Sequence, residues 1–114
     1  MSGIFSCTLG KTYASSLNEG VTAYKHGNLE KAVAKWAPLA EKNNSIAQYN
    51  LGVLYQNGFE GSPNYSLAVK WYRKAASNGL SQASYNLGLM YELGKGVPQD
   101  YDSAAKWYKK AAKN

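Results

Sequence analysis

The stretch AQYNLGVLYQNG at residues 47–58 is restated as ASYNLGLMYELG at residues 83–94. The stretch AVKWYRKAASN at residues 68–78 recurs in the same way as AAKWYKKAAKN at residues 104–114. Both pairs are separated by one interval, 83 − 47 = 36 residues, and 16 of the 32 aligned positions are identical. A fixed period of about 20 to 50 residues is the signature of stacked repeats, in which each unit buries its apolar face against its neighbours.

Each period contains two helical patterns joined by a short polar loop. The first pattern starts at Ser45, with Gln48 three residues on at the spacing of a capping box. Its apolar residues follow at steps of three and four, and Gly58 falls where a left-handed helix end favours glycine. The second pattern follows Asn64, or Asp100 in the later copy, and both residue types are good N-caps. The sequence therefore predicts a pair of helices in each unit.

One glycine lies in the middle of the predicted first helix of each of these two copies. Gly52 and Gly88 occupy equivalent positions, where glycine costs about 1 kcal/mol relative to alanine. Because this unfavourable residue occurs at the same position in both copies, we expect another helix to approach closely at these points. The Trp-Tyr pairs of the second helices supply bulky side chains to meet them.

A third, diverged unit is predicted upstream. Ser16 and Glu19 form a capping-box spacing at the start of a helix that runs to His26. Asn28 is placed to cap the next helix. Pro38 removes one hydrogen bond from that helix and is expected to kink it, but the apolar stripe continues to about Lys42.

The predicted fold is therefore an all-α solenoid of three stacked antiparallel helix pairs. Residues 1–12 match no repeat and are interpreted as a flexible leader. A repeat domain follows at residues 13–114. The predicted units are about 13–44, 45–80 and 81–114.

The quoted stretches resemble the Sel-1-like repeat family, a relative of the tetratricopeptide repeat. The resemblance covers residues 47–114 closely and residues 16–46 weakly. It implies a helical repeat solenoid of bacterial origin that serves as an adaptor scaffold for protein or peptide partners. One branch of that family carries paired cysteines in its repeats, whereas Cys7 is the only cysteine here. The compartment stays open between cytoplasm, envelope and secretion.

Composition gives little support to catalysis, cofactor or metal binding, or nucleic-acid binding. His26 is the only histidine, and the seven carboxylates are scattered along the chain. We therefore expect no catalytic site, no cofactor and no metal. The net charge is +6, but the basic residues recur on the second helix of each unit, which favours a solvated outer face over a nucleic-acid site. No segment is apolar over the length that a membrane span needs.

What remains is a surface, and in arrays of this kind the first helices line the concave side. The candidate partner-binding residues are side chains off the packing stripe of those helices. They are Asn18, Thr22, Lys25, Tyr49, Val53, Gln56, Tyr85, Leu89 and Glu92. Asn50 and Asn86 offer amide groups to a peptide backbone. Because Tyr49, Tyr85 and these two asparagines belong to the repeat signature, a structural role between units competes with binding. The residues that do not repeat are better candidates for specificity, namely Lys25, Gln56, Glu92 and Leu93.

Two other functions stay open. Trp107, Tyr108 and Ala111 lie in the last predicted helix, where no further unit covers them, so the array could associate with itself through this end. The resemblance alone also allows a hydrolase of cell-wall-like substrates, because such activity has been ascribed to some members of the family.

Overall fold

The computed structural model describes residues 2–59 and 61–113, and the side chains of residues 14–59 and 61–113. This part of the chain forms six α-helices and one isolated β-bridge, between Phe59 and Ser62, but no β-strand. The helices are α1 (Ser2–Lys25), α2 (Leu29–Glu41), α3 (Ser45–Asn57), α4 (Tyr65–Ser77), α5 (Ser81–Leu93) and α6 (Tyr101–Lys113).

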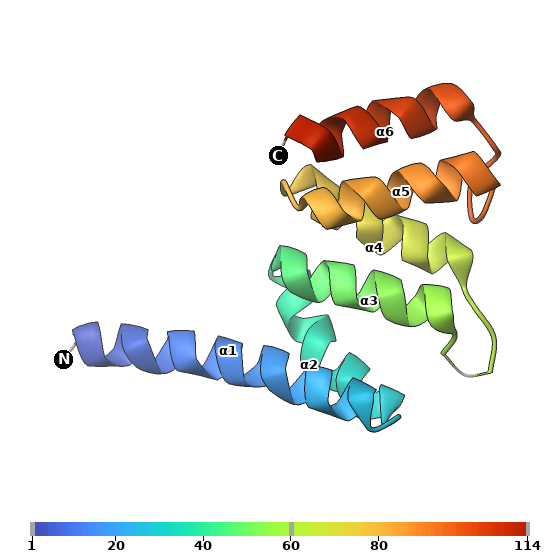
Figure 1. Ribbon diagram of the computed structural model, residues 1–114. Helices are drawn as coiled ribbons and strands as arrows, with labels where there is room; N and C mark the ends of the chain where they lie inside the picture. Colours follow the sequence, from blue (N-terminus) through green and yellow to red (C-terminus); the bar gives the residue numbers. More distant parts are fainter. Residues whose placement is uncertain (1, 60, 114) are drawn as a thin grey trace.

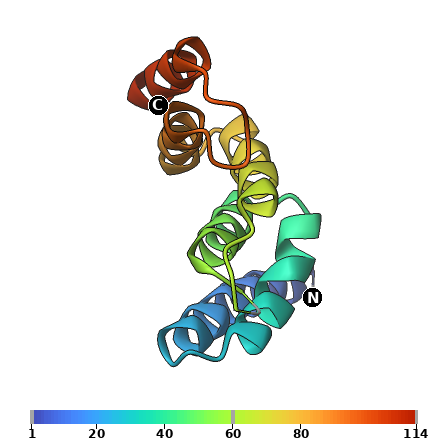
Figure 2. The same cartoon turned by 90° about the vertical axis from the view of Figure 1, so that its right-hand side faces the viewer.

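Each helix packs against its neighbours in sequence, which produces three antiparallel pairs stacked in order (Figure 1). Helices α1, α3 and α5 lie along one side of the stack, α2 and α4 lie along the other, and α6 closes one end (Figure 2). The predicted all-α solenoid of three helix pairs is confirmed.

Two apolar clusters run through the stack. The first joins α1 to α4 and includes Trp36, Leu51 and Trp71, and the second joins α4 to α6 around Tyr72 and Leu87. Because every cluster draws on at least two helix pairs, no pair could bury its apolar stripe alone.

Trp71 and Trp107 have equivalent surroundings one unit apart. Trp71 packs in the first cluster, which contains buried residues of α3. Trp107 packs against the second cluster, which contains buried residues of α5. The ammonium of Lys74 lies 5.1 Å from the ring centroid of Trp71, and that of Lys110 lies 5.1 Å from the ring centroid of Trp107. The repeated sequence is thus a repeated structure.

The mid-helix glycines mark close helix contacts, as predicted. A Cβ added to Gly52 would lie 2.5 Å from the Tyr72 ring, and one added to Gly88 would lie 2.6 Å from the Tyr108 ring. Gly20 has the same relationship to Trp36, whose indole N–H also donates to the Leu17 carbonyl at 3.3 Å. The diverged first unit therefore keeps the contact with a different aromatic residue.

Three of the predicted helix N-caps are confirmed, but neither predicted capping box is. The side chains of Asn28, Asn64 and Asp100 accept hydrogen bonds from backbone N–H groups in the following turn. At α3 the cap is Asn44 rather than Ser45, and Asn44 accepts from the Ala47 N–H at 2.9 Å. The predicted partner of Ser45 in the capping box, the side chain at position 48, turns instead into the interface between units.

The first helix begins earlier than predicted. Helix α1 starts at Ser2, so Ser16 lies inside it and the capping box with Glu19 is wrong. No proline interrupts α1, and the Glu19 carboxylate pairs with the Lys35 ammonium of α2 at 2.8 Å. The hydrogen bond and positive charge of Lys35 lower the pKa of Glu19. The side chains of residues 1–13, Cys7 among them, lie outside those described, and the flexible leader over residues 1–12 stays a prediction.

Helix α2 continues through its internal proline, as predicted. Pro38 lies within the helix, which ends at Glu41 with Lys42 as its C-cap. The apolar stripe explains the continuation, because Leu39 and Ala40 beyond the proline are both buried in the first cluster.

Candidate recognition face

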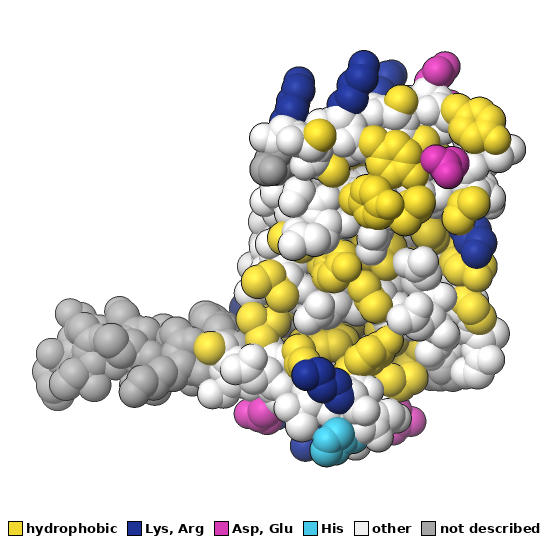
Figure 3. All heavy atoms as spheres, viewed as in Figure 1, with side chains coloured by type: hydrophobic (Ala, Val, Ile, Leu, Met, Phe, Trp, Pro, Cys, Tyr) yellow, Lys and Arg dark blue, Asp and Glu magenta, His cyan; other side chains and the backbone are white. Residues whose placement is uncertain are grey.

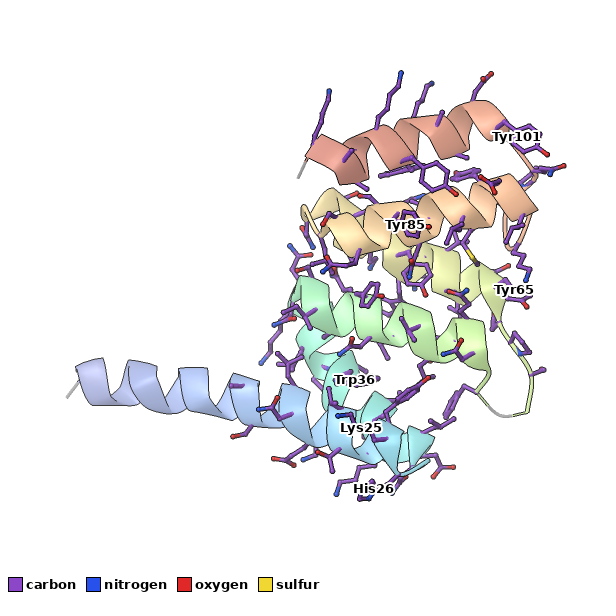
Figure 4. The ribbon with its side chains drawn as sticks, viewed as in Figure 1. Lys25, His26, Trp36, Tyr65, Tyr85 and Tyr101 are labelled. Atoms are coloured by element: carbon purple, nitrogen blue, oxygen red, sulfur yellow. The ribbon has the colours of Figure 1, made fainter. Side chains whose placement is uncertain are left out.

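Helices α1, α3 and α5 present one continuous side of the molecule, which we call the first-helix face. Apolar side chains gather on it in a band that runs from α5 and α6 across α3 (Figure 3). Tyr85 stands on this face at α5, and Lys25 lies at the end of α1 (Figure 4). Three hollows follow the band. They lie between α1 and α3, between α3 and α5, and between α5 and α6.

The first hollow lies between α1 and α3 and has a volume of about 340 Å³. Its walls are mostly apolar, and polar groups enter from Lys25 and Asn50. The lining residues are Val21, Tyr24, Lys25, Trp36, Tyr49, Asn50 and Val53. The Tyr24 hydroxyl on this wall accepts a hydrogen bond from Asn57 at 2.9 Å, which ties α1 directly to α3.

The second hollow lies between α3 and α5 and has a volume of about 470 Å³. It is lined by Tyr49, Ser81, Gln82, Tyr85, Asn86 and Ala111. Tyr49 lines both the first and the second hollow, so the two are neighbours along the face.

The third hollow, of about 640 Å³, lies between α5 and α6. It is lined by Tyr85, Leu89, Glu92, Tyr108, Ala111 and Ala112. Tyr85 is shared with the second hollow and is 52% exposed, which leaves much of its ring open to a partner.

Paired tyrosines hold the walls of these hollows in place. The ring centroids of Tyr49 and Tyr72 lie 5.8 Å apart at 43°, and those of Tyr85 and Tyr108 lie 5.5 Å apart at 43°. Tilted aromatic pairs of this kind add about 0.5–1.5 kcal/mol beyond their burial. One ring of each pair comes from a first helix and the other from the second helix of the same unit.

Hydrogen bonds fix the second-helix tyrosines from behind. The Tyr72 hydroxyl donates to the Gln56 side chain at 2.5 Å and is also hydrogen-bonded by Asn86. The Tyr108 hydroxyl donates to the equivalent residue, Glu92, at 3.2 Å. The repeated units therefore share this hydrogen bond from the tyrosine hydroxyl as well as the packing of the ring on glycine.

Both of these tyrosines are held in the neutral form. Burial raises the pKa of Tyr72 well above its ordinary value, although the hydrogen bond from Asn86 opposes the shift. Burial and the neighbouring Glu92 carboxylate raise the pKa of Tyr108. Each phenol therefore acts as a hydrogen-bond donor near neutral pH.

The structure brings most of the predicted residues to the hollows. Lys25, Tyr49 and Val53 line the first, Tyr49 and Tyr85 line the second, and Tyr85, Leu89 and Glu92 line the third. Gln56 supports Tyr72 instead of lining a hollow. Asn18 and Thr22 are exposed on α1 and line none of the three. Leu93 is 57% exposed at the end of α5.

Some lining residues were missed because they come from the second helices. Trp36 and Tyr108 reach the face from α2 and α6. A usable signal was present, since Tyr72 and Tyr108 each follow a mid-helix glycine by 20 residues (72 − 52 = 20). Of these two rings, Tyr108 lines the third hollow, whereas Tyr72 is fully buried.

The described residues hold no group of three or more His, Cys, Asp and Glu side chains that could bind a metal ion. His26 is exposed in the turn after α1. Of the carboxylates, Glu19 pairs with Lys35 and Asp100 caps α6. Among the described residues, no helix combines the length and the apolarity that a membrane span requires.

A scan against protein-family models matches the Sel1 repeat at residues 45–80 and again at residues 81–114. The chain belongs to the Sel1 repeat family. Sel1 repeats generally act as protein-interaction scaffolds and are generally non-catalytic.

Solved structures of bacterial Sel1 repeat proteins resemble this chain. A Sel1 repeat protein from Oxalobacter formigenes is 38% identical, with a TM-score of 0.76 over 82% of this chain and 39% of that one. The protein c5321, a protective antigen present in uropathogenic Escherichia coli strains and displaying an SLR fold, is 39% identical, with a TM-score of 0.80 over 89% of this chain and 22% of its own. The present chain therefore spans only a minor part of these two relatives.

A third structure shows the shared fold alone. The cysteine rich protein B of Helicobacter pylori is 22% identical, with a TM-score of 0.75 over 95% of this chain and 86% of that one. The Sel1 repeats of the present chain contain no cysteine, since Cys7 precedes both of them.

Proposed function

We propose that this Sel1 repeat protein is a non-catalytic scaffold that binds a peptide segment of a protein partner along its first-helix face. The observation that carries the proposal is the row of three adjoining hollows, in which neighbours share Tyr49 or Tyr85. An extended peptide advances about 3.3 Å per residue, so a segment of several residues can cross neighbouring hollows.

The chemistry of the row suits a peptide. Tyrosine rings supply large contact areas at a low cost in conformational entropy, and they are enriched at the centres of protein interfaces. Asn50 and Asn86 place amide groups in the first and second hollows, where they can bond to a peptide backbone.

Charge gives the row a direction. Lys25 lies in the first hollow and Glu92 lies in the third, so cation and carboxylate occupy opposite ends of the row. We expect the bound peptide to carry an acidic residue near α1 and a basic residue near α6. Such complementarity sets orientation and register more than raw affinity.

Selection from a random peptide library tests this proposal. The selected peptides should share aromatic or aliphatic residues between an acidic and a basic position. Tyr85→Ala should weaken their binding about tenfold or more, as expected for a central aromatic residue of an interface. Lys106→Ala removes an exposed side chain of α6 outside the three hollows and serves as the control, which should bind normally.

Circular dichroism must show that both variants keep their helices. If no peptide is selected, or if Tyr85→Ala binds the selected peptides as tightly as the parent protein, recognition at this face is wrong. Lys25→Glu provides a second criterion. It should change the preferred residue at the acidic end of the peptide and leave the rest of the selected pattern intact.

A further inference from the structure

A basic hollow, which we call the α4 hollow, is formed by α4 and by the turn between α2 and α3. Its volume is about 470 Å³. The lining residues are Asn43, Lys70, Arg73, Lys74, Ser77 and Asn78. Helices α2 and α4 lie along the side of the stack opposite α1, α3 and α5 (Figure 2). None of the lining residues belongs to the three hollows of the first-helix face, so the α4 hollow is a separate feature.

One side of α4 supplies most of the lining. Lys70, Arg73, Lys74 and Ser77 follow one another at steps of three, one and three residues, and this spacing keeps them on one side of a helix. All four are exposed, whereas α4 buries its opposite side in the two apolar clusters. The hollow therefore receives three cations and a hydroxyl from two turns of one helix.

The three cations of the α4 hollow have no opposite charge beside them. No Asp or Glu lines the hollow, and α4 contains neither residue type. Among the described residues, no carboxylate lies within ion-pair distance of Lys70, Arg73 or Lys74, whereas Lys35 of α2 pairs with Glu19. Because like charges in one hollow repel one another, an anion that enters it is stabilised.

Aromatic side chains hold these cations in place. The ammonium of Lys70 lies 5.2 Å from the ring centroid of Trp71, and that of Lys74 lies 5.1 Å from the same centroid. The guanidinium of Arg73 donates to the Tyr91 hydroxyl at 2.8 Å, which engages one of its five N–H donors. Side chains that are already held in this way lose less conformational entropy when an anion binds.

Two amides complete the wall. The Asn78 side chain donates to the Asn43 side chain at 2.9 Å, and Asn43 donates back at 3.3 Å. Asn43 lies in the turn after α2, and Asn78 is the C-cap of α4. The pair therefore fixes the edge of the hollow across the boundary between the first two units.

The other two units do not provide this combination. In the first unit, the positions 36 residues before the three cations hold Ala34, Ala37 and Pro38. In the last unit, the positions 36 residues after them hold Lys106, Lys109 and Lys110. The amide wall is lost there, because Gly79 takes the place of Asn43. The α4 hollow is thus the one place in the three units where three cations meet an asparagine pair.

We propose that the α4 hollow binds a phosphoryl group on a serine or threonine side chain of a partner protein. A phosphate monoester carries about −1.5 to −2 charges at neutral pH and three acceptor oxygens, so one group can engage both ammonium groups and the guanidinium. A single carboxylate has less charge and fewer acceptor atoms. The hollow also has room for the peptide residues beside the phosphoryl group.

The small number of cations argues against an anionic membrane as the occupant. Three cations line the α4 hollow, whereas polybasic segments that bind anionic lipid surfaces carry about four to eight. The proposal does not depend on the peptide of the first-helix face, since the two sites share no lining residue.

A short labelled peptide with a central phosphoserine between glycines is the probe, and its binding to the full chain is measured by fluorescence anisotropy at low salt. It should bind at least about tenfold more tightly than the same peptide with unmodified serine, because charge-assisted hydrogen bonds are the strong ones. Raising the salt concentration should weaken the binding, since the cations are exposed.

Lys74→Gln should weaken binding of the phosphopeptide about fivefold to tenfold, because it removes one charged donor. Lys110→Gln is the matched control. Lys110 lies 5.1 Å from the ring centroid of Trp107, as Lys74 does from that of Trp71, but it does not line the α4 hollow. Both variants lose one positive charge, so a difference between them cannot come from net charge. Circular dichroism must show that both keep their helices.

The proposal is overturned if the phosphopeptide does not bind at millimolar concentration, or if Lys74→Gln and Lys110→Gln bind it equally. Three further results would overturn the choice of ligand. A glutamate peptide that binds as tightly would show a site for any acidic side chain. Inorganic phosphate that binds as tightly would show a site for the free anion. Cosedimentation with vesicles of phosphatidylcholine and phosphatidylserine that only Lys74→Gln abolishes would show a membrane contact.

Tyr85→Ala separates this proposal from recognition at the first-helix face. Tyr85 lines the second and third hollows and lies outside the α4 hollow. The variant should therefore bind the phosphopeptide as the parent protein does. Failure of the library selection at the first-helix face would leave this result untouched, whereas a loss of phosphopeptide binding in Tyr85→Ala would place the phosphoryl site on the wrong face.

Discussion

The Tyr72 ring occupies the space that a side chain at Gly52 would need. A Cβ built on Gly52 would lie 2.5 Å from Cε1 of Tyr72, far inside ordinary van der Waals contact. Gly88 and Tyr108 have the same relationship at 2.6 Å. Each of these two units is therefore closed by a ring that packs on bare backbone, and in the last unit that ring, Tyr108, also lines the third hollow.

Gly52→Ala should destabilise the protein by about 1–3 kcal/mol through overpacking, although alanine is the better helix former. Tyr72 cannot swing aside, because it is fully buried and bonded to Gln56. Gly88→Ala should cost less, since Tyr108 is only half-buried and can shift. Urea unfolding of the two variants measures the difference, and a Gly52→Ala protein as stable as the parent would refute the close contact.

A buried amide joins the first two units, and its removal should be costly. The Gln48 side chain donates to the Ala40 carbonyl at 3.1 Å and accepts from Asn78 at 3.0 Å. Gln48→Leu leaves that carbonyl without its side-chain donor, and we expect a loss of about 1–3 kcal/mol in the free energy of unfolding.

Ser84 provides the matched control for Gln48. It stands 36 residues after Gln48 and is fully buried, but its hydroxyl has no hydrogen-bond partner among the described residues. Ser84→Ala should therefore be neutral or slightly stabilising. Equal losses for Gln48→Leu and Ser84→Ala in chemical denaturation would show that the amide network contributes nothing specific.

Stability should fall in alkali because Tyr72 resists ionisation. Burial raises its folded pKa above the ordinary value of 10.0. A group whose folded pKa is raised contributes its full stabilisation below its unfolded pKa and loses it as the pH rises toward the folded pKa. The free energy of unfolding should therefore decline above about pH 10, and Tyr72→Phe should make this decline shallower.

Absorbance at alkaline pH checks the assignment. Tyr72 should ionise together with unfolding, whereas exposed tyrosines such as Tyr101 should ionise first. A phenylalanine variant with the same alkaline decline as the parent would assign the effect to other tyrosines.

The helical repeat could be predicted from the sequence because its signals are local and stated twice. The interval of 36 residues, the caps at Asn28 and Asn64 and the glycines at positions 52 and 88 each act within one unit. The start of α1 could not be predicted, because the sequence of residues 1–15 is not repeated later in the chain and contains no proline that would mark a boundary. Ser16 resembled a cap only in isolation.

The recognition face was partly predictable for a related reason. Helical phase places Tyr49, Val53, Tyr85 and Leu89 off the packing stripe of the first helices. It says nothing about which second-helix rings emerge between them. Trp36 packs over Gly20 and Tyr108 packs over Gly88, where a larger side chain would occupy the space of the ring. Both rings line hollows, and this depends on packing between helices, which helical phase does not describe.

Chemical-shift mapping with a library-selected peptide tests recognition at the first-helix face most directly. We predict that the methyl groups of Val53 and Leu89 and the rings of Tyr49 and Tyr85 shift together on titration, while the alanine methyl groups at the exposed positions 34 and 105 stay unchanged. Shifts confined to α2, α4 and the outer side of α6, with the first-helix face unaffected, would contradict the account.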